Sequence, residues 1–211
     1  GEYAAALKYY SKDFLFSAGK FTEASILAGE DAFSEKDYSE AIRYFESAGE
    51  SAKTRWADAV YEQALVYLNS RDFDKSLEYL NKISDETRAQ EQIGVATLEK
   101  AKQQYADGNT EEALKTAEGI KNTKYADVTA FFDMVYSETA KKHFSQGDYQ
   151  SALANYQKCV KNSAAKTNSE ILTGLIEKRY MEAASLADAS IVSGSTDISR
   201  DEWAKAFDEC I

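Results

Sequence analysis

The chain of 211 residues contains no proline and only ten glycines. Proline removes a backbone donor and clashes with the preceding helical turn, so a chain without it can form many uninterrupted helices. The sequence also lacks any long segment in which apolar and polar residues alternate, which is the pattern of a half-buried strand. Together these absences predict an all-α protein.

Basic residues are in the minority, with 25 Lys and Arg against 36 Asp and Glu, and the formal net charge is −11. A surface of this sign repels phosphate backbones and anionic lipids, which argues against nucleic-acid or membrane-surface binding. No apolar run reaches the roughly 18 residues of a membrane-spanning helix. Because the chain begins with Gly1 rather than Met, we expect a signal peptide, tether or domain before it. This expectation favours an extracytoplasmic or membrane-tethered location over a cytoplasmic one.

Side chains typical of catalytic or metal sites are scarce. The one histidine, His143, has no second imidazole or cysteine near it in the sequence. The two cysteines, Cys159 and Cys210, form neither a zinc pattern nor a disulfide framework. Phosphate-binding, dinucleotide-binding and nucleophile-elbow motifs are all absent. The sequence therefore predicts a protein that is not an enzyme and that uses no cofactor or metal.

A short pattern recurs along the chain, in which a base or glycine, a polar residue and usually an aromatic residue stand together. Its copies are spaced by 35, 35, 37 and 39 residues, and a period of about 20–50 residues indicates stacked repeats. A small residue recurs three positions after the aromatic position and another nine positions before it. The copies are GEY (1–3), KDY (36–38), RDF (71–73), GNT (108–110) and GDY (147–149), and the small residues are Ala6, Ala41, Ser76, Ala113 and Ala152, and Gly29, Ala64, Ala101 and Ala140.

Each repeat predicts a helical hairpin. Small residues on two antiparallel helices let the axes approach closely, and larger residues one turn away fill the space beside the contact. Gly108 and Gly147 suit the left-handed turn, while Asp37 with Glu40 and Asn109 with Glu112 have the spacing of a capping box. We expect first helices over roughly 15–35, 53–70, 87–107 and 124–146, and second helices over 2–12, 37–49, 72–83, 109–121 and 148–162.

The C-terminal part departs from the repeat. Thr167 and Glu170 have capping-box spacing and predict a helix to about residue 188, followed by a turn rich in Ser and Gly. Ser199 and Glu202 predict a last helix, with Ile198 and Trp203 as a hydrophobic staple and Trp203, Phe207 and Ile211 on one stripe. We expect this helix to cover the end of the stack. Residues 1–165 would then form the array, and 166–211 a degenerate last hairpin and capping helix within one continuous domain.

These repeats resemble the tetratricopeptide repeat, a family of stacked helical hairpins of about 34 residues. The resemblance covers roughly residues 1–162, and AGEDAFSEKDYSEAIRYFESA (28–48) is the best copy. The family's proline after the second helix and its early tryptophan are absent from every copy. The resemblance implies a right-handed superhelical α-solenoid of about five TPR-like hairpins, closed by a C-terminal capping helix.

In that family the first helices line a concave groove, with residues at i, i+4 and i+7 pointing into it. Apolar and aromatic members at these positions predict a scaffold that binds a partner helix or peptide, with Tyr61 and Tyr105 as anchors and nearby lysines favouring acidic partners. One alternative is that these residues pack between hairpins. Another is a structural spacer or self-assembly element of a larger, bacterial-type protein. The groove residues in this register are Tyr61, Leu65, Leu68, Leu98, Lys102, Tyr105, Lys141 and Phe144.

Overall fold

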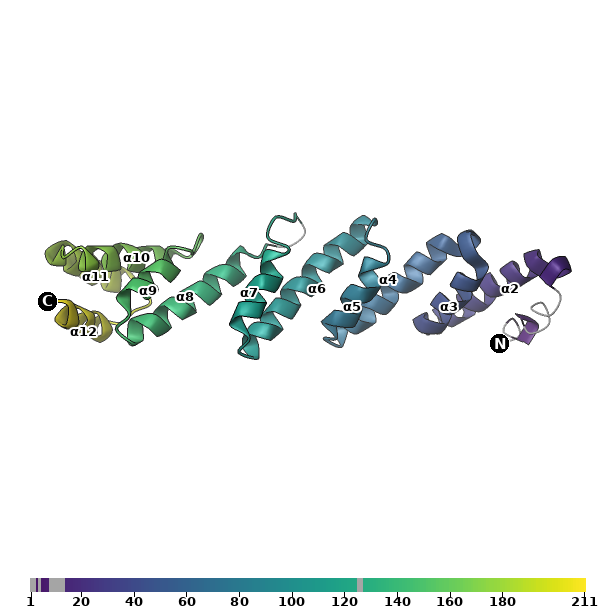
Figure 1. Cartoon of the computed structure of the whole chain (residues 1–211), viewed down its shortest axis with the longest axis horizontal. Coiled ribbons are helices and arrows are strands. Elements are labelled where there is room, and N and C mark those ends of the chain that lie inside the picture. The colour runs from purple at the N-terminus through teal and green to yellow at the C-terminus, as the bar shows by residue number, and fades with distance from the viewer. Residues whose placement is uncertain (1–2, 4, 8–13, 125–126) are drawn as a thin grey trace. The chain divides into compact units, whose positions relative to one another are not determined.

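The computed structural model describes residues 3, 5–7, 14–124 and 127–211. Helices make up most of these ranges and none of their residues lies in a β-strand, so the all-α prediction is confirmed (Figure 1). The helix predicted over 2–12 falls largely outside the described residues.

The helices divide into two compact units. Unit 1 contains α2 (Phe14–Ser34), α3 (Tyr38–Ala48), the short 3-10 helix η1 (Gly49–Ala52), α4 (Lys53–Asn69), α5 (Phe73–Asn81) and α6 (Thr87–Ala106). Unit 2 contains α7 (Thr110–Glu118), α8 (Thr129–Ser145), α9 (Tyr149–Tyr156), α10 (Ser163–Ile176), α11 (Tyr180–Ser193) and α12 (Arg200–Cys210).

In unit 1 each helix from α2 to α6 packs against the next one in the sequence, and in unit 2 the same is true from α8 to α12. The observed helices of unit 1 match the predicted ranges to within two residues at each end. In unit 2 the matching is poorer: α8 begins at Thr129 rather than near residue 124, and α9 ends at Tyr156 rather than near residue 162.

Small residues permit the close helix contacts that the repeat pattern predicts. In unit 1, a Cβ atom added to Gly29 would lie 2.5 Å from the ring of Phe45, so the α2 backbone and this ring are in direct contact. Ala41 and Ala64 are fully buried in the same core. In unit 2, Ala140 and Ala152 are likewise fully buried. Larger side chains at these positions would push the paired helices apart.

The turns inside the hairpins adopt left-handed backbone conformations. Gly108 and Gly147 have φ values of 86° and 77°, as expected for glycine, while Lys36, Arg71 and Lys178 adopt φ near 62° despite their side chains. The next residue but one begins a helix in each case, and the intervening Asp37, Asp72 or Asp148 accepts a hydrogen bond from the backbone N–H three positions ahead. Asn109 makes no such side-chain hydrogen bond, so the capping box predicted there is not formed.

The prediction of a single helix from Thr167 to about residue 188 is wrong. α10 begins earlier, after Asn162, whose side chain accepts a hydrogen bond from the backbone N–H of Ala165. Thr167 lies inside that helix, where its hydroxyl donates to the backbone carbonyl of Ser163. The spacing of Thr167 and Glu170 therefore matched a capping box without forming one.

A further hairpin replaces that single helix. α10 ends at Ile176, and Lys178, with a φ of 62°, reverses the chain into α11. Tyr180 and Ala183 repeat the spacing of turn aromatic and small residue seen in the earlier copies. A Cβ atom added to Gly174 would lie 3.1 Å from the Cβ of Ala183, so the two helices of this hairpin also meet closely at a small residue.

A buried carboxylate fixes the segment between α9 and α10. Asp133 on α8 is 5% exposed, and its two oxygens accept hydrogen bonds from the backbone N–H groups of Val160 and Lys161, both at 2.7 Å. The thiol of Cys159 lies beside it, and burial raises the pKa of this thiol to about 11. Sequence reasoning missed Asp133 because its partners are backbone groups more than 25 residues away.

We expect Ala152→Leu to destabilise the protein by about 1–3 kcal/mol, because extra methylenes at a close helix contact force the hairpin open. Ala41→Leu should behave in the same way in unit 1. Equilibrium urea melts test both variants, and Ala154→Leu, which changes an exposed residue of the same helix α9, is the matched control. Equal midpoints for Ala152→Leu and Ala154→Leu would contradict the packing described above.

Asp133→Ala should destabilise the protein by about 2–3 kcal/mol, because it leaves two backbone donors without their charged acceptor. Asp133→Asn should cost less, since its amide oxygen still accepts one of the two hydrogen bonds. Hydrogen exchange should show faster exchange at the amides of Val160 and Lys161 in both variants. Unchanged exchange at these two amides would contradict the role assigned to Asp133.

Candidate binding face

The groove register predicted from the sequence falls on both units. Tyr61, Leu65 and Leu68 lie on α4 and Leu98, Lys102 and Tyr105 on α6, and we call these six residues the first-helix face of unit 1. Lys141 and Phe144 lie on α8 of unit 2.

The side chains of the first-helix face are partly exposed. Lys102 is exposed, and the five others are half-buried. Tyr61 and Leu68 pack partly against the buried core of unit 1, so the alternative that some of these residues pack between helices holds for those two. Val95, which is 41% exposed on α6, adds an apolar side chain that the predicted register omitted. Its position three residues before Leu98 was the available signal.

Ion pairs join successive first helices of unit 1. Glu30 on α2 pairs with Arg55 on α4 at 3.3 Å, and Asp58 on α4 pairs with Arg88 on α6 at 2.8 Å. The guanidinium of Arg88 also lies over the ring of Tyr61, 4.8 Å from its centroid. A hollow of about 180 Å³ lies beside the first of these pairs, lined by Glu30, Phe33, Ser34, Arg55 and Asp58.

Two carboxylates hold the Arg88 side chain. Burial acts to lower its pKa, but hydrogen bonds to the carboxylates of Glu86 and Asp58 outweigh burial, and the pKa is raised. Its hydrogen bonds to Glu86, just before α6, and to Asp58 on α4 hold the guanidinium over the ring of Tyr61. Tyr61 is consequently less available to a partner than a surface tyrosine would be.

Phe144 is a correction to the predicted groove, because the C-terminal helix covers it. Its ring packs edge-on against Trp203 of α12 with centroids 4.9 Å apart, and Phe144 is only 6% exposed. Lys141, one turn earlier on α8, is exposed and pairs with Asp197, just before α12, at 2.6 Å. Phe144 therefore belongs to the core of unit 2 and is not open to a partner.

The α12 segment, which we take as residues 195–211, is held by four helices of unit 2. Beyond Phe144 on α8, Tyr149 on α9 donates from its hydroxyl to Glu209, and the hydroxyl of Tyr180 on α11 donates to the carbonyl of Cys210 at 2.8 Å. Asn168, buried on α10, donates to Asp197 at 2.7 Å. Figure 1 shows α12 beside α10 and α11, as their contacts require.

The start of α12 is formed as predicted. Ser199 and Glu202 make both hydrogen bonds of the capping box, and the Ser199 hydrogen bonds hold the pKa of Glu202 below its usual range. Ile198 and Trp203 are both buried in the core of unit 2, as expected for a staple. The predicted stripe is shorter than expected, because Ile211 is 82% exposed.

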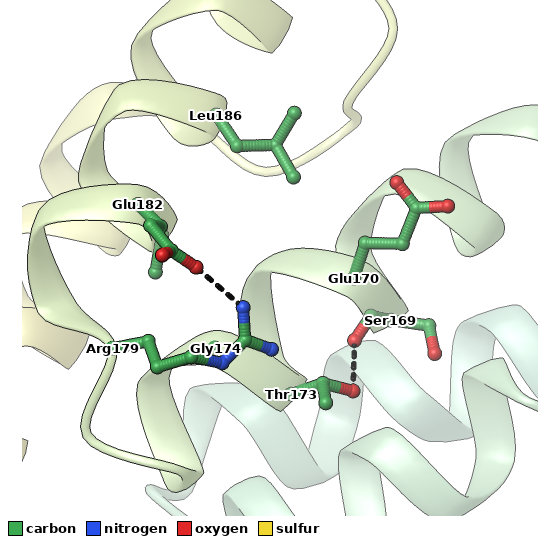
Figure 2. Close-up of a pocket in the computed structure, with 8 residues that line it drawn as sticks. Ser169, Glu170, Thr173, Gly174, Arg179, Glu182 and Leu186 are labelled. Carbon is green, nitrogen blue, oxygen red and sulfur yellow. Dashed lines mark hydrogen bonds and ion pairs between the residues drawn. The ribbon is translucent and has the colours of Figure 1, made fainter.

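A second hollow, of about 360 Å³, lies between α10 and α11. Figure 2 shows the guanidinium of Arg179 directed toward Glu182, with which it forms an ion pair at 2.6 Å, and Arg179 also pairs with Glu177. The hollow is thus lined by a cation whose charge is already neutralised. Its lining residues are Ser169, Glu170, Thr173, Gly174, Arg179, Glu182, Ala183 and Leu186.

The same hollow occurs at the same place of the α2–α3 hairpin, where Ala32 and Tyr44 correspond to Gly174 and Leu186. In the α4–α5 hairpin the corresponding residues are Tyr67 and Tyr79, and their rings pack with centroids 5.4 Å apart. The hollow therefore opens wherever the first helix carries a small residue at this position. It is a consequence of the hairpin packing rather than a dedicated ligand site.

The histidine of the chain lies next to a carboxylate. The Nδ1 atom of His143 lies 3.1 Å from Asp148, beside the α8–α9 turn. Within the described ranges, no three His, Cys, Asp or Glu side chains gather where they could hold a metal ion, and no helix there is long and apolar enough to cross a membrane.

No protein-family model matches the chain, and no curated protein is similar to it in sequence.

Trp203→Ala should destabilise the protein by about 3–5 kcal/mol, because it leaves a large cavity against Phe144. Ile211→Ala, which shortens an exposed residue of the same segment, is the matched control and should change stability by less than about 0.5 kcal/mol. Thermal melts followed by circular dichroism measure both. A Trp203→Ala variant as stable as Ile211→Ala would show that α12 is not docked as described.

Proposed function

We propose that this chain is a non-catalytic protein-interaction scaffold, in which the first-helix face of unit 1 holds a helix or peptide of a partner protein. We further propose that its hairpins are TPR-like and stack as a right-handed superhelical solenoid, the arrangement that the repeat pattern implies. In such a stack the first helices would share one concave surface.

One observation carries the proposal. In unit 2, the two residues of the predicted groove register both contact the α12 segment: Lys141 pairs with Asp197 and Phe144 packs on Trp203. In unit 2, these two register positions therefore lie on a surface that holds a helix. The first-helix face of unit 1 occupies the same register positions, which supports a similar role for it.

The chemistry of the first-helix face suits a segment that mixes apolar and acidic residues. Leu65, Leu98 and Val95 offer apolar contact area, and Tyr105 offers a large rigid ring, the kind of side chain that contributes most at protein interfaces. Lys102, which pairs with Glu99 of its own helix, presents an exposed ammonium group on the same stripe as Leu98 and Tyr105. Ion pairs between the first helices would form a polar border to the contact.

We expect Tyr61→Ser/Tyr105→Ser to lose at least tenfold in affinity for peptides that bind this face, because the accessible parts of both aromatic rings are removed. Such peptides can be selected from a random library displayed on phage, using the immobilised wild-type chain. The control is Tyr44→Ser/Tyr79→Ser, which changes two half-buried tyrosines on the second helices α3 and α5. Binding of the selected peptides to each variant is then measured by isothermal calorimetry.

Melting temperatures decide how a loss of binding is interpreted. Loss of binding in Tyr61→Ser/Tyr105→Ser, with binding kept in the control and similar melting temperatures, supports the proposal. Selected peptides that bind the two double variants equally well would refute it. Failure to select any peptide would instead favour the alternative, a structural spacer or self-assembly element.

A further inference from the structure

Helices α6 and α8 carry two copies of the same surface. At a constant offset of 39 residues, Glu99 corresponds to Glu138, Ala101 to Ala140, Lys102 to Lys141 and Tyr105 to Phe144. The exposed residue one turn before also corresponds, since Val95 is 41% and Met134 39% exposed. Both helices therefore present Glu, Lys and an aromatic ring three residues apart along one stripe.

The copy on α8 shows what this surface holds. Its lysine, Lys141, forms an ion pair with the carboxylate of Asp197. Its aromatic ring, that of Phe144, packs edge-on against the indole of Trp203. Asp197 lies two residues before Ser199, the N-cap of α12, and Trp203 follows Asp197 by six residues. The ligand of this surface is thus an acid just before a helix, followed by a large aromatic on the first turns of that helix.

The copy on α6 has similar groups, and among the residues that the structure describes its lysine pairs with a carboxylate of its own helix alone. Lys102 pairs with Glu99 of its own helix at 2.6 Å, and the side chains of the two are 48% and 40% exposed. Such an exposed pair contributes little to stability and can be replaced by an incoming carboxylate at small cost. Tyr105 and Leu98 are half-buried beside it, so part of each side chain remains accessible.

We infer that the α6 copy binds a partner helix with the chemistry of α12: an Asp or Glu shortly before the helix, and a Trp or Phe six residues later. This inference rests on the proposed function and adds to it the chemistry of the partner. The occupant is assigned to a separate protein, because the α12 segment of this chain is already used, with Trp203 only 2% exposed against its own core. The acidic character of the partner follows from Lys102 and from the α12 segment, in which acids outnumber bases.

A peptide of residues 195–211 with Cys210→Ser, labelled with fluorescein, is the probe for this site. We expect saturable binding to the full chain by fluorescence anisotropy at low ionic strength. Lys102→Glu should weaken binding at least tenfold, because it replaces attraction for the peptide carboxylate by repulsion. Trp203→Ala in the peptide should weaken it to a similar degree, because the aromatic contact with Tyr105 is lost.

Two variants of the chain control for charge and for location. Lys100→Glu makes the same charge change on the same helix, at a residue that pairs with Asp74 of α5, and should leave binding within about twofold of wild type. Lys141→Glu tests whether the peptide instead displaces α12 from α8. Because Lys102 is exposed, Lys102→Glu should keep the wild-type melting temperature, so a loss of binding reports on the surface itself.

The outcomes separate this inference from the proposed function. Binding lost in Lys102→Glu and kept in Lys100→Glu and Lys141→Glu supports the inference. Binding lost only in Lys141→Glu, or no binding at all, overturns it, while library peptides that depend on Tyr61 and Tyr105 would still support the proposed function. A concentration-dependent dimer in sedimentation velocity that Lys102→Glu abolishes would overturn the assignment to a separate partner, because the occupant would then be α12 of a second copy.

Discussion

The close contact between the two helices of each hairpin is the constraint on which the other features depend. At Gly29 against Phe45, and at Gly174 against Ala183, the helices approach so closely that an added Cβ atom would meet the neighbouring side chain. A contact of this kind fixes the rotation of each helix about its own axis. Within each unit, the stripe beside this contact on a first helix is therefore held in a fixed direction relative to the paired helix, whether its residues are apolar, aromatic or charged.

That fixed rotation explains how one register produces two different surfaces. On α8 the stripe of Lys141 and Phe144 is used inside the molecule, where it holds α12 and helps to close the core of unit 2. On α6 the stripe of Lys102 and Tyr105 has nearly the same residues but remains partly exposed. The same register therefore supplies buried core contacts on α8 and a partly exposed stripe on α6.

The same constraint leaves another position between the two helices of a hairpin free to vary. Where the first helix carries Tyr67, its ring fills the space against Tyr79, and where it carries Ala32 or Gly174 a hollow opens instead. The turns also vary in sequence. A left-handed conformation that glycine adopts more easily is adopted there by Lys36, Arg71 and Lys178.

The sequence by itself determined the all-α class, the helices of unit 1 to within two residues, and the capping box of Ser199 and Glu202, because each depends on residues close together in the chain. It also contained the signal for the α10–α11 hairpin in Tyr180 and Ala183, although the turn at Lys178 has no glycine to mark it. Only the tertiary structure decided that α12 docks on α8 and buries Phe144. Such contacts join residues about 60 positions apart, and local periodicity carries no information about which distant segment will cover a given face.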